Sequence, residues 1–135
     1  MGGRDRRQHL LRLVQRPPES CASLRWLSEY HKPIIVSEPG AGALAGYHGS
    51  DQQRFTEEIQ ALVYRFNLVM LESIEALRGV SPWVLKNFRA QRRPLPGIQD
   101  FWNRKGMLPE TGVRKQAWYL LQDWYANKKE TGKNE

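Results

Sequence analysis

A single glutamate, Glu38, stands two residues after a run of three apolar β-forming residues and directly before a Pro-Gly break. The uninterrupted apolar run at residues 34–36 is typical of a strand that is buried on both faces, as in a parallel sheet covered by helices. In a βα-barrel, catalytic groups lie at the carboxyl ends of such strands. Glu38 is therefore a candidate catalytic residue, although the spacing equally fits a carboxylate that only ends the strand or caps the next helix.

One helix is expected before this strand in the sequence and another after it. Over residues 20–31 apolar residues recur at helical spacing, at Leu24, Leu27 and Tyr30. A longer apolar stripe is expected to face the core, and its members are Phe55, Ile59, Leu62, Phe66, Val69, Ile74 and Leu77. The carboxylates of this helix, Glu57 among them, are expected on a solvated face. Ser50 with Gln53 resembles a capping box at the helix start, and Gly79 resembles its stop signal.

The second strand is expected at residues 83–85, directly before Lys86 and Asn87. A strand, a long helix and a second strand form a crossover unit, which implies parallel pairing. Residues 89–110 show no periodicity, and a loop of that length is usually functional or disordered. A final amphipathic helix is expected over residues 113–124. The sequence therefore predicts an α/β fold.

The composition is that of a globular chain with a basic balance. Of the 135 residues 40% are hydrophobic, which suffices for one modest core. Lys and Arg number 21 against 14 acidic residues, and the pI of about 9.9 permits binding to phosphates or acidic sugars. The one cysteine, Cys21, excludes an internal disulfide. Since neither a membrane span nor a secretory signal is recognisable, we expect a cytoplasmic chain.

Residues for metal or cofactor chemistry are not gathered anywhere in the sequence. His9, His31 and His48 are scattered, and there is neither a Cys/His pattern for zinc nor a glycine-rich phosphate loop. No metal and no cofactor are therefore expected. His48 lies in a loop rich in glycine and alanine, where it is either a proton carrier or, as the favoured alternative, a side chain held by solvent or a local hydrogen bond.

The chain divides into three segments. Residues 1–20 form a basic leader, which is a solvated extension, a product of a wrong start site or shifted reading frame, or an arm that binds nucleic acid. Residues 21–127 contain the predicted elements, and residues 128–135 form a polar tail. The basic residues do not line one helix face and no nucleic-acid-binding motif is present, so a nucleic-acid-binding module is the less favoured reading.

Two stretches resemble glycoside hydrolase family 2. Residues 32–49, KPIIVSEPGAGALAGYHG, followed by RFTEEIQ, are similar to the nucleophile region of its β-glucuronidases and β-galactosidases. Residues 81–125, which include SPWVLKNF and FWNRKG, are similar to the segment that closes the same barrel. The resemblance covers residues 23–127. It implies the last two βα units, strands 7 and 8, of a (β/α)8 TIM barrel, and hence an incomplete barrel.

The resemblance assigns roles to three residues. Glu38 matches the catalytic nucleophile, and Asn103 with Lys105 matches an Asn-x-Lys motif that recognises the carboxylate of glucuronic acid. A lysine charge beside an amide donor favours a uronate over a neutral sugar. The alternative is a polar loop that turns into Gly106.

The family's chemistry also requires a second carboxylic acid, which the sequence does not supply in a recognisable place. A retaining glycosidase pairs its nucleophile with an acid–base group about 5–5.5 Å away. Glu110, Asp100 and Glu29 are stand-ins without support, and the pair Asn134-Glu135 is attributed to chance. A complete barrel takes about 250 residues. We therefore expect this chain to be inactive by itself.

The expected function is that of a hydrolase segment: a retaining β-glycosidase, most like β-glucuronidase. The alternatives are a β-galactosidase or another family 2 β-glycosidase, and beyond these a non-catalytic fragment. The expected partner is a carbohydrate, a β-glucuronide or β-galactoside, with neither nucleic acid nor membrane, and a homo-oligomer of the full-length enzyme is left open. Two departures bear on the site: Pro39 replaces an aromatic residue after the nucleophile, and Lys86 stands where many members carry a tryptophan that lines the sugar subsite.

Overall fold

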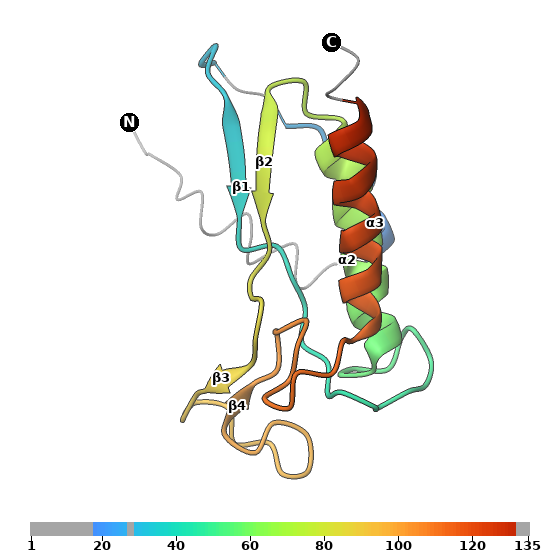
Figure 1. Cartoon of the computed structure of the whole chain (residues 1–135), viewed down its shortest axis with the longest axis vertical. Helices are drawn as coiled ribbons and strands as arrows, with labels where there is room; N and C mark the ends of the chain where they lie inside the picture. The colour runs from blue at the N-terminus through green and yellow to red at the C-terminus, as the bar shows by residue number, and fades with distance from the viewer. Residues whose placement is uncertain (1–17, 27–28, 132–135) are drawn as a thin grey trace.

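The computed structural model describes residues 18–26 and 29–131. In Figure 1 the long red helix lies in front of the long green helix, both run alongside the sheet, and a small hairpin lies beyond one end of the sheet. The elements are η1 (Pro18–Cys21), β1 (Ile34–Ser37), α2 (Glu57–Glu72), β2 (Leu77–Ser81), β3 (Phe88–Arg89), β4 (Trp102–Asn103) and α3 (Gln116–Thr131). The α/β fold is as predicted, and the described residues form no closed barrel.

The β1–α2–β2 unit is the parallel crossover expected from the sequence. Strand β1 confirms the strand expected at the apolar run of residues 34–36 and pairs in parallel with β2. The second strand was predicted at residues 83–85, and this is wrong, because β2 lies at Leu77–Ser81. Gly79 lies inside β2 opposite Ile35 and does not stop a helix. Both strand arrows in Figure 1 point toward the β3–β4 hairpin, so both carboxyl ends open on the side of the hairpin.

Helix α2 begins later than the predicted capping box. Thr56 is the N-cap, and its Oγ1 accepts a hydrogen bond from the Ile59 N–H (3.2 Å). Residues 50–53 form a turn instead, in which the Gln53 N–H donates to the Ser50 carbonyl (3.0 Å). The helix ends at Glu72, which leaves the following residues free to pair with β1.

The buried face of α2 includes polar side chains that an apolar stripe does not reveal. Val69, predicted to face the core, is 51% exposed, whereas Glu57, predicted to be solvated, is only 6% exposed. The buried residues are Glu57, Gln60, Ala61, Tyr64, Leu68, Met70 and Leu71. The polar members are buried because they bind backbone groups of the loops beyond the sheet. The N-terminal half of α2 therefore binds the backbone of these loops through its buried polar side chains.

The core lies between the two helices and one face of the sheet. Its buried members are Val36, Tyr64, Leu68, Met70, Leu71, Ile74, Met107, Ala117 and Leu121. Ile35 points to the other face of β1 and is 72% exposed. The strand predicted to be buried on both faces is therefore covered on one face only, because the described residues supply no second layer.

The segment before β1 is not the helix expected over residues 20–31. η1 is a single 3-10 turn, and no helix follows it within residues 22–26 or 29–31. Leu24 packs against the core, and the Trp26 indole N–H donates to the Met70 sulfur (3.2 Å). Leu27 lies outside the described residues, as do residues 1–17 of the basic leader.

Helix α3 confirms the final predicted helix and continues to Thr131, into the segment predicted as a polar tail. Lys128 and Lys129 occupy its last turn, where positive charge suits the helix dipole. No described helix is long and apolar enough to cross a membrane.

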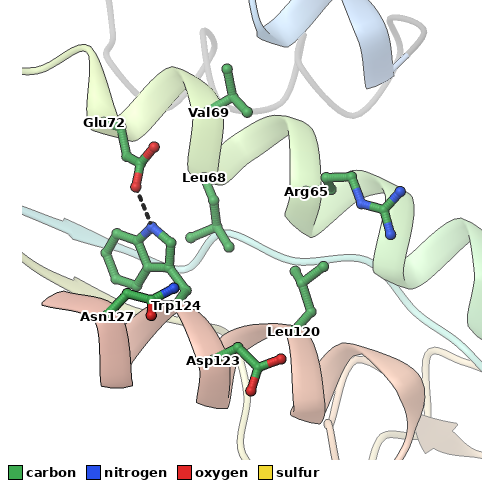
Figure 2. A pocket seen from close by; sticks show the side chains of 8 residues that line it. All are labelled: Arg65, Leu68, Val69, Glu72, Leu120, Asp123, Trp124 and Asn127. Carbon is green, nitrogen blue, oxygen red and sulfur yellow. Dashed lines mark hydrogen bonds between the residues drawn. The ribbon is translucent and has the colours of Figure 1, made fainter.

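Helices α2 and α3 border a shallow hollow of about 290 Å³ on the molecular surface. As Figure 2 shows, the Trp124 indole N–H donates to Glu72 across it (2.9 Å). Its lining residues are Arg65, Leu68, Val69, Glu72, Leu120, Asp123, Trp124 and Asn127. None of them is a candidate site residue, so the hollow is distinct from the site described next.

Candidate active site

Glu38 lies at the carboxyl end of β1. Its N–H donates to the Ser81 carbonyl (2.9 Å), which continues the β1–β2 ladder by one residue, and its side chain is exposed. Its φ of 70° lies in the left-handed region. Such a conformation costs a non-glycine residue about 1–3 kcal/mol and clusters at functional sites.

Pro39, the departure from the family pattern beside Glu38, is fixed from two sides. It is buried, and its carbonyl accepts hydrogen bonds from the Trp83 N–H (3.0 Å) and the Tyr64 hydroxyl (3.1 Å). The backbone after Glu38 is therefore anchored to α2 and to the segment that follows β2.

Asn103 and Lys105 form one local unit at the end of β4. The Asn103 side-chain oxygen accepts a hydrogen bond from the Lys105 N–H (3.0 Å), which is an Asx-turn. Asn103 lies opposite Phe88 in the β3–β4 hairpin. The hairpin also corrects the prediction that residues 89–110 lack regular structure, since its two short strands pair residues far apart in sequence.

The charge of Lys105 interacts with those of Glu38 and Arg93. Burial lowers the pKa of the half-buried Lys105, the positive charge of Arg93 lowers it further, and the negative charge of Glu38 raises it in part. Backbone hydrogen bonds join the segments of Glu38 and Lys105, since the Trp83 N–H donates to the Pro39 carbonyl (3.0 Å) and the Val84 N–H donates to the Lys105 carbonyl (3.4 Å). A partly buried cation of this kind is suited to bind a ligand carboxylate.

Trp83 lies in this region but was not among the site residues predicted from the sequence. It follows β2 by two residues, and its ring meets Phe88 edge to face with centroids 6.1 Å apart. Both side chains are exposed. Trp83 was assigned to a strand, which left Lys86 where an aromatic residue was expected. Pro82 gave no signal against that strand, because it directly precedes residues 83–85 just as Pro33 directly precedes β1.

None of the stand-in acids has the properties of a general acid. Burial acts to raise the pKa of Glu110, but hydrogen bonds from its own backbone, Arg104 and Asn87 outweigh it and lower that pKa. Arg104 donates to both Glu110 oxygens at 3.0 Å. Asp100 accepts the Gly97 N–H (2.8 Å), Glu29 is exposed, and residues 134–135 lie outside the described part of the chain. A general acid must instead keep its proton near neutral pH.

His48 is held by a local hydrogen bond on the surface. Its Nδ1 lies 2.9 Å from Glu58 Oε1, and this contact raises the pKa of His48. Gln116 at the start of α3 donates to the same Glu58 oxygen (2.8 Å). His48 therefore has a structural partner. Within residues 18–26 and 29–131 no group of three or more His, Cys, Asp or Glu side chains is placed to hold a metal ion.

No protein-family model matches the chain. The chain is 33% identical over 102 residues to the β-glucuronidase of Rattus norvegicus and 31% identical over 102 residues to that of Homo sapiens. Each match covers 74% of this chain and 15% of the relative. The chain thus spans less than a fifth of the length of these curated relatives.

Solved structures give the same result. A GH2 β-galacturonidase from Eisenbergiella tayi, bound to galacturonate, matches with a TM-score of 0.63 and 28% identity, over 71% of this chain and 17% of that structure. The β-D-glucuronidase of Dictyoglomus thermophilum matches with a TM-score of 0.64 and 27% identity, over 72% of this chain and 16% of that structure. The chain therefore resembles a segment of enzymes of glycoside hydrolase family 2, as its motifs indicated. More narrowly, it is similar to a segment of the β-glucuronidases within that family.

Proposed function

We propose that this chain supplies the nucleophile and the uronate-binding residues of a retaining β-glycosidase, most like a β-glucuronidase. The observation that carries the proposal is that residues 83–84, beyond the carboxyl end of β2, bind both segments: the Trp83 N–H donates to the Pro39 carbonyl beside Glu38 (3.0 Å), and the Val84 N–H donates to the Lys105 carbonyl (3.4 Å). In this proposal Glu38 is the nucleophile, and Asn103 and Lys105 bind the substrate carboxylate. The similarity to β-glucuronidases supports the substrate class.

The reaction proceeds in two steps. The Glu38 carboxylate attacks the anomeric carbon, the bond from that carbon to the glycosidic oxygen breaks, and the leaving oxygen takes a proton from a general acid. Water, activated by the same acid–base group, then hydrolyses the glycosyl ester and frees Glu38. The exposed side chain and left-handed backbone of Glu38 support its role as the attacking group.

Uronate recognition is assigned to the cations near Glu38. The Lys105 ammonium is half-buried, so a substrate carboxylate bound to it is screened little by solvent. Arg93 adds positive charge beside it. Trp83, which is exposed beyond β2, is proposed to pack against the sugar ring.

We further propose that residues 21–127 are the C-terminal part of a (β/α)8 barrel, in which β1 and β2 are strands 7 and 8. The parallel β1–α2–β2 unit followed by α3 supports this assignment. So does Ile35, which is 72% exposed on the uncovered face of the sheet, where barrel strands carry inward-facing side chains.

The purified 135-residue chain is expected to release no 4-nitrophenol from 4-nitrophenyl β-D-glucuronide. The reaction needs a general acid, and the two acids of the segment 97–110 are already bound to other groups. A continuous absorbance assay at high enzyme concentration measures this, with a complete β-glucuronidase as the positive control. Turnover that disappears in a Glu38→Ala variant would show that the chain is active alone.

Lys105→Ala is expected to lower kcat/KM for an aryl β-glucuronide by about 100-fold, because removing one partner of a buried charge pair costs about 2–5 kcal/mol. The test uses a chimeric enzyme in which residues 21–127 replace the matching segment of the Dictyoglomus thermophilum β-D-glucuronidase. Hydrolysis of an aryl β-galactoside, which carries no carboxylate, is expected to change little. Lys32→Ala is the matched control, since that lysine is exposed and precedes β1, at the opposite end of the strand from Glu38. Equal losses on both substrates would argue for a neutral β-glycosidase such as a β-galactosidase.

A β-galacturonidase is the second candidate. The Eisenbergiella tayi relative binds galacturonate, and Lys105 is equally suited to the carboxylate of either uronic acid. The ratio of glucuronide to galacturonide turnover in the chimeric enzyme separates the two. The nucleic-acid alternative has less support, because Arg89 stacks on Trp102 at 4.5 Å and Arg104 is bound to Glu110.

A further inference from the structure

A lysine is completely buried beside the candidate site. Lys115, directly before α3, is 0% exposed. Its ammonium donates to the Ala43 carbonyl (2.5 Å) and to the Arg104 carbonyl (3.0 Å). Lysine is almost never fully buried unless its charge is bound by other groups. The ammonium of Lys115 is thus committed to two backbone acceptors.

The two acceptors belong to different loops of the candidate site. Ala43 is in the β1 loop, residues 39–46, which begins next to Glu38. Arg104 is in the uronate loop, residues 103–107, which carries Lys105. The loops also pair directly, because the Ala43 N–H donates to the Arg104 carbonyl (3.0 Å). Lys115 therefore binds both loops at the point where they meet.

The charged groups that face Lys115 come from α2 and from the segment around the uronate loop. Burial lowers the pKa of Lys115 to about 8, and the charges of Glu57, which raises it, Arg104, which lowers it, and Glu110, which raises it, act in addition. Glu57 itself accepts the Gly46 N–H of the β1 loop (2.8 Å) and the Gln116 N–H of α3 (2.8 Å). The Glu57 carboxylate, from α2, and the Lys115 ammonium, from the residue directly before α3, therefore both bind the β1 loop.

We propose that Lys115 is a positioning residue that holds the β1 loop and the uronate loop as one unit, so that Glu38 and Lys105 keep a fixed spacing. Its importance for catalysis rests on the proposed function, whereas the linkage of the loops does not. Lys115 does not touch a substrate in this proposal, because its side chain is fully buried; it acts through the two loops that it binds.

Carbon-detected NMR of the full chain tests the linkage through its pH profile. As the pH rises, the carbonyl carbons of Ala43 and Arg104 are expected to shift together, with one midpoint at about 8. In Lys115→Met both transitions are expected to disappear. In the control Lys105→Met, which removes the half-buried lysine charge of the same region, both are expected to remain.

Hydrogen exchange at neutral pH gives a second measurement. The Ala43 and Lys105 amides are expected to be equally protected in the wild-type chain, and in Lys115→Met their protection is expected to differ by about tenfold, since a buried acceptor is left unpaired. Different midpoints for the two carbonyls, transitions that persist in Lys115→Met, or equal protection in that variant would overturn the proposal.

If Lys115→Met does not fold, two measurements remain. The wild-type chain still shows whether the two carbonyls share one midpoint, and Lys115→Arg keeps the charge but does not titrate in this range, so both transitions are expected to vanish. Two midpoints in the wild type, or a transition retained in Lys115→Arg, would overturn the proposal. No substrate enters these measurements, so failure of the glycosidase assays leaves their outcome unchanged.

Discussion

Glu38→Ala in the chimeric enzyme is expected to lower kcat for an aryl β-glucuronide by at least about 10⁴-fold, as removal of a covalent nucleophile does in other enzymes. The reason is that no glycosyl ester forms without the carboxylate. The measurement is steady-state release of the phenol. Glu75→Ala is the matched control: Glu75 is an exposed glutamate between α2 and β2, and its removal is expected to leave kcat within about twofold, because exposed substitutions rarely disturb a fold.

Two further results separate a nucleophile from a residue that only supports the fold. Azide is expected to restore bond cleavage in Glu38→Ala and to give an α-glycosyl azide, because it occupies the space of the missing carboxylate and attacks the same carbon. A 2-deoxy-2-fluoro glucuronyl fluoride is expected to label the peptide that contains Glu38, as detected by mass spectrometry. Labelling of a different peptide, or retention of most of the activity in Glu38→Ala, would refute the assignment.

The local features of the sequence predicted β1 and its glutamate well. An unbroken apolar run that is followed closely by a Pro-Gly pair needs no information from the rest of the chain to be recognised as a strand. The Asx-turn at Asn103 is local in the same way, since it joins residues two apart. These short-range patterns locate two parts of the candidate site in the sequence, the end of β1 and the turn at Asn103.

Strand β2 shows why other elements were misplaced. Leu77–Ser81 contains Arg78 and Gly79, which weaken any strand pattern in the sequence. It is a strand because it pairs directly with β1, although α2 separates the two strands in the sequence. The pairing is a contact between distant residues and leaves no period in the sequence. The second strand was therefore predicted at the stronger apolar pattern of residues 83–85, and Trp83 was not included among the candidate site residues.

The buried polar groups could not be predicted for a related reason. Glu57, Gln60 and Lys115 are residue types that are usually solvated, so the favoured expectation for each is an exposed position. They are buried because carbonyls and N–H groups of the loops at residues 39–46 and 103–107 need partners. Those loops meet only after the chain has folded, and a single sequence does not show which side chains will bind them.

Gly106 tests whether the uronate loop is packed as the proposed site requires. A Cβ at this position would lie 2.3 Å from the Asn87 backbone nitrogen and 2.6 Å from the Lys86 carbonyl carbon. These are main-chain atoms, which cannot rotate away as a side chain does. The Gly106 N–H also donates to the Asn87 side chain (3.0 Å), so any displacement breaks a buried hydrogen bond.

Gly106→Ala is therefore expected to destabilise the chain by about 2–4 kcal/mol, the range of an overpacked core position that also loses a buried hydrogen bond. Urea unfolding followed by tryptophan fluorescence measures the change. Gly79→Ala is the matched control, because the nearest atoms to its Cβ are Ile35 side-chain carbons at 3.7 and 3.8 Å, and its cost is expected to stay below about 1 kcal/mol. If the two variants were equally stable, the uronate loop would not be packed against Lys86 and Asn87. Lys105 would then lack the fixed position beside Glu38 that uronate recognition needs.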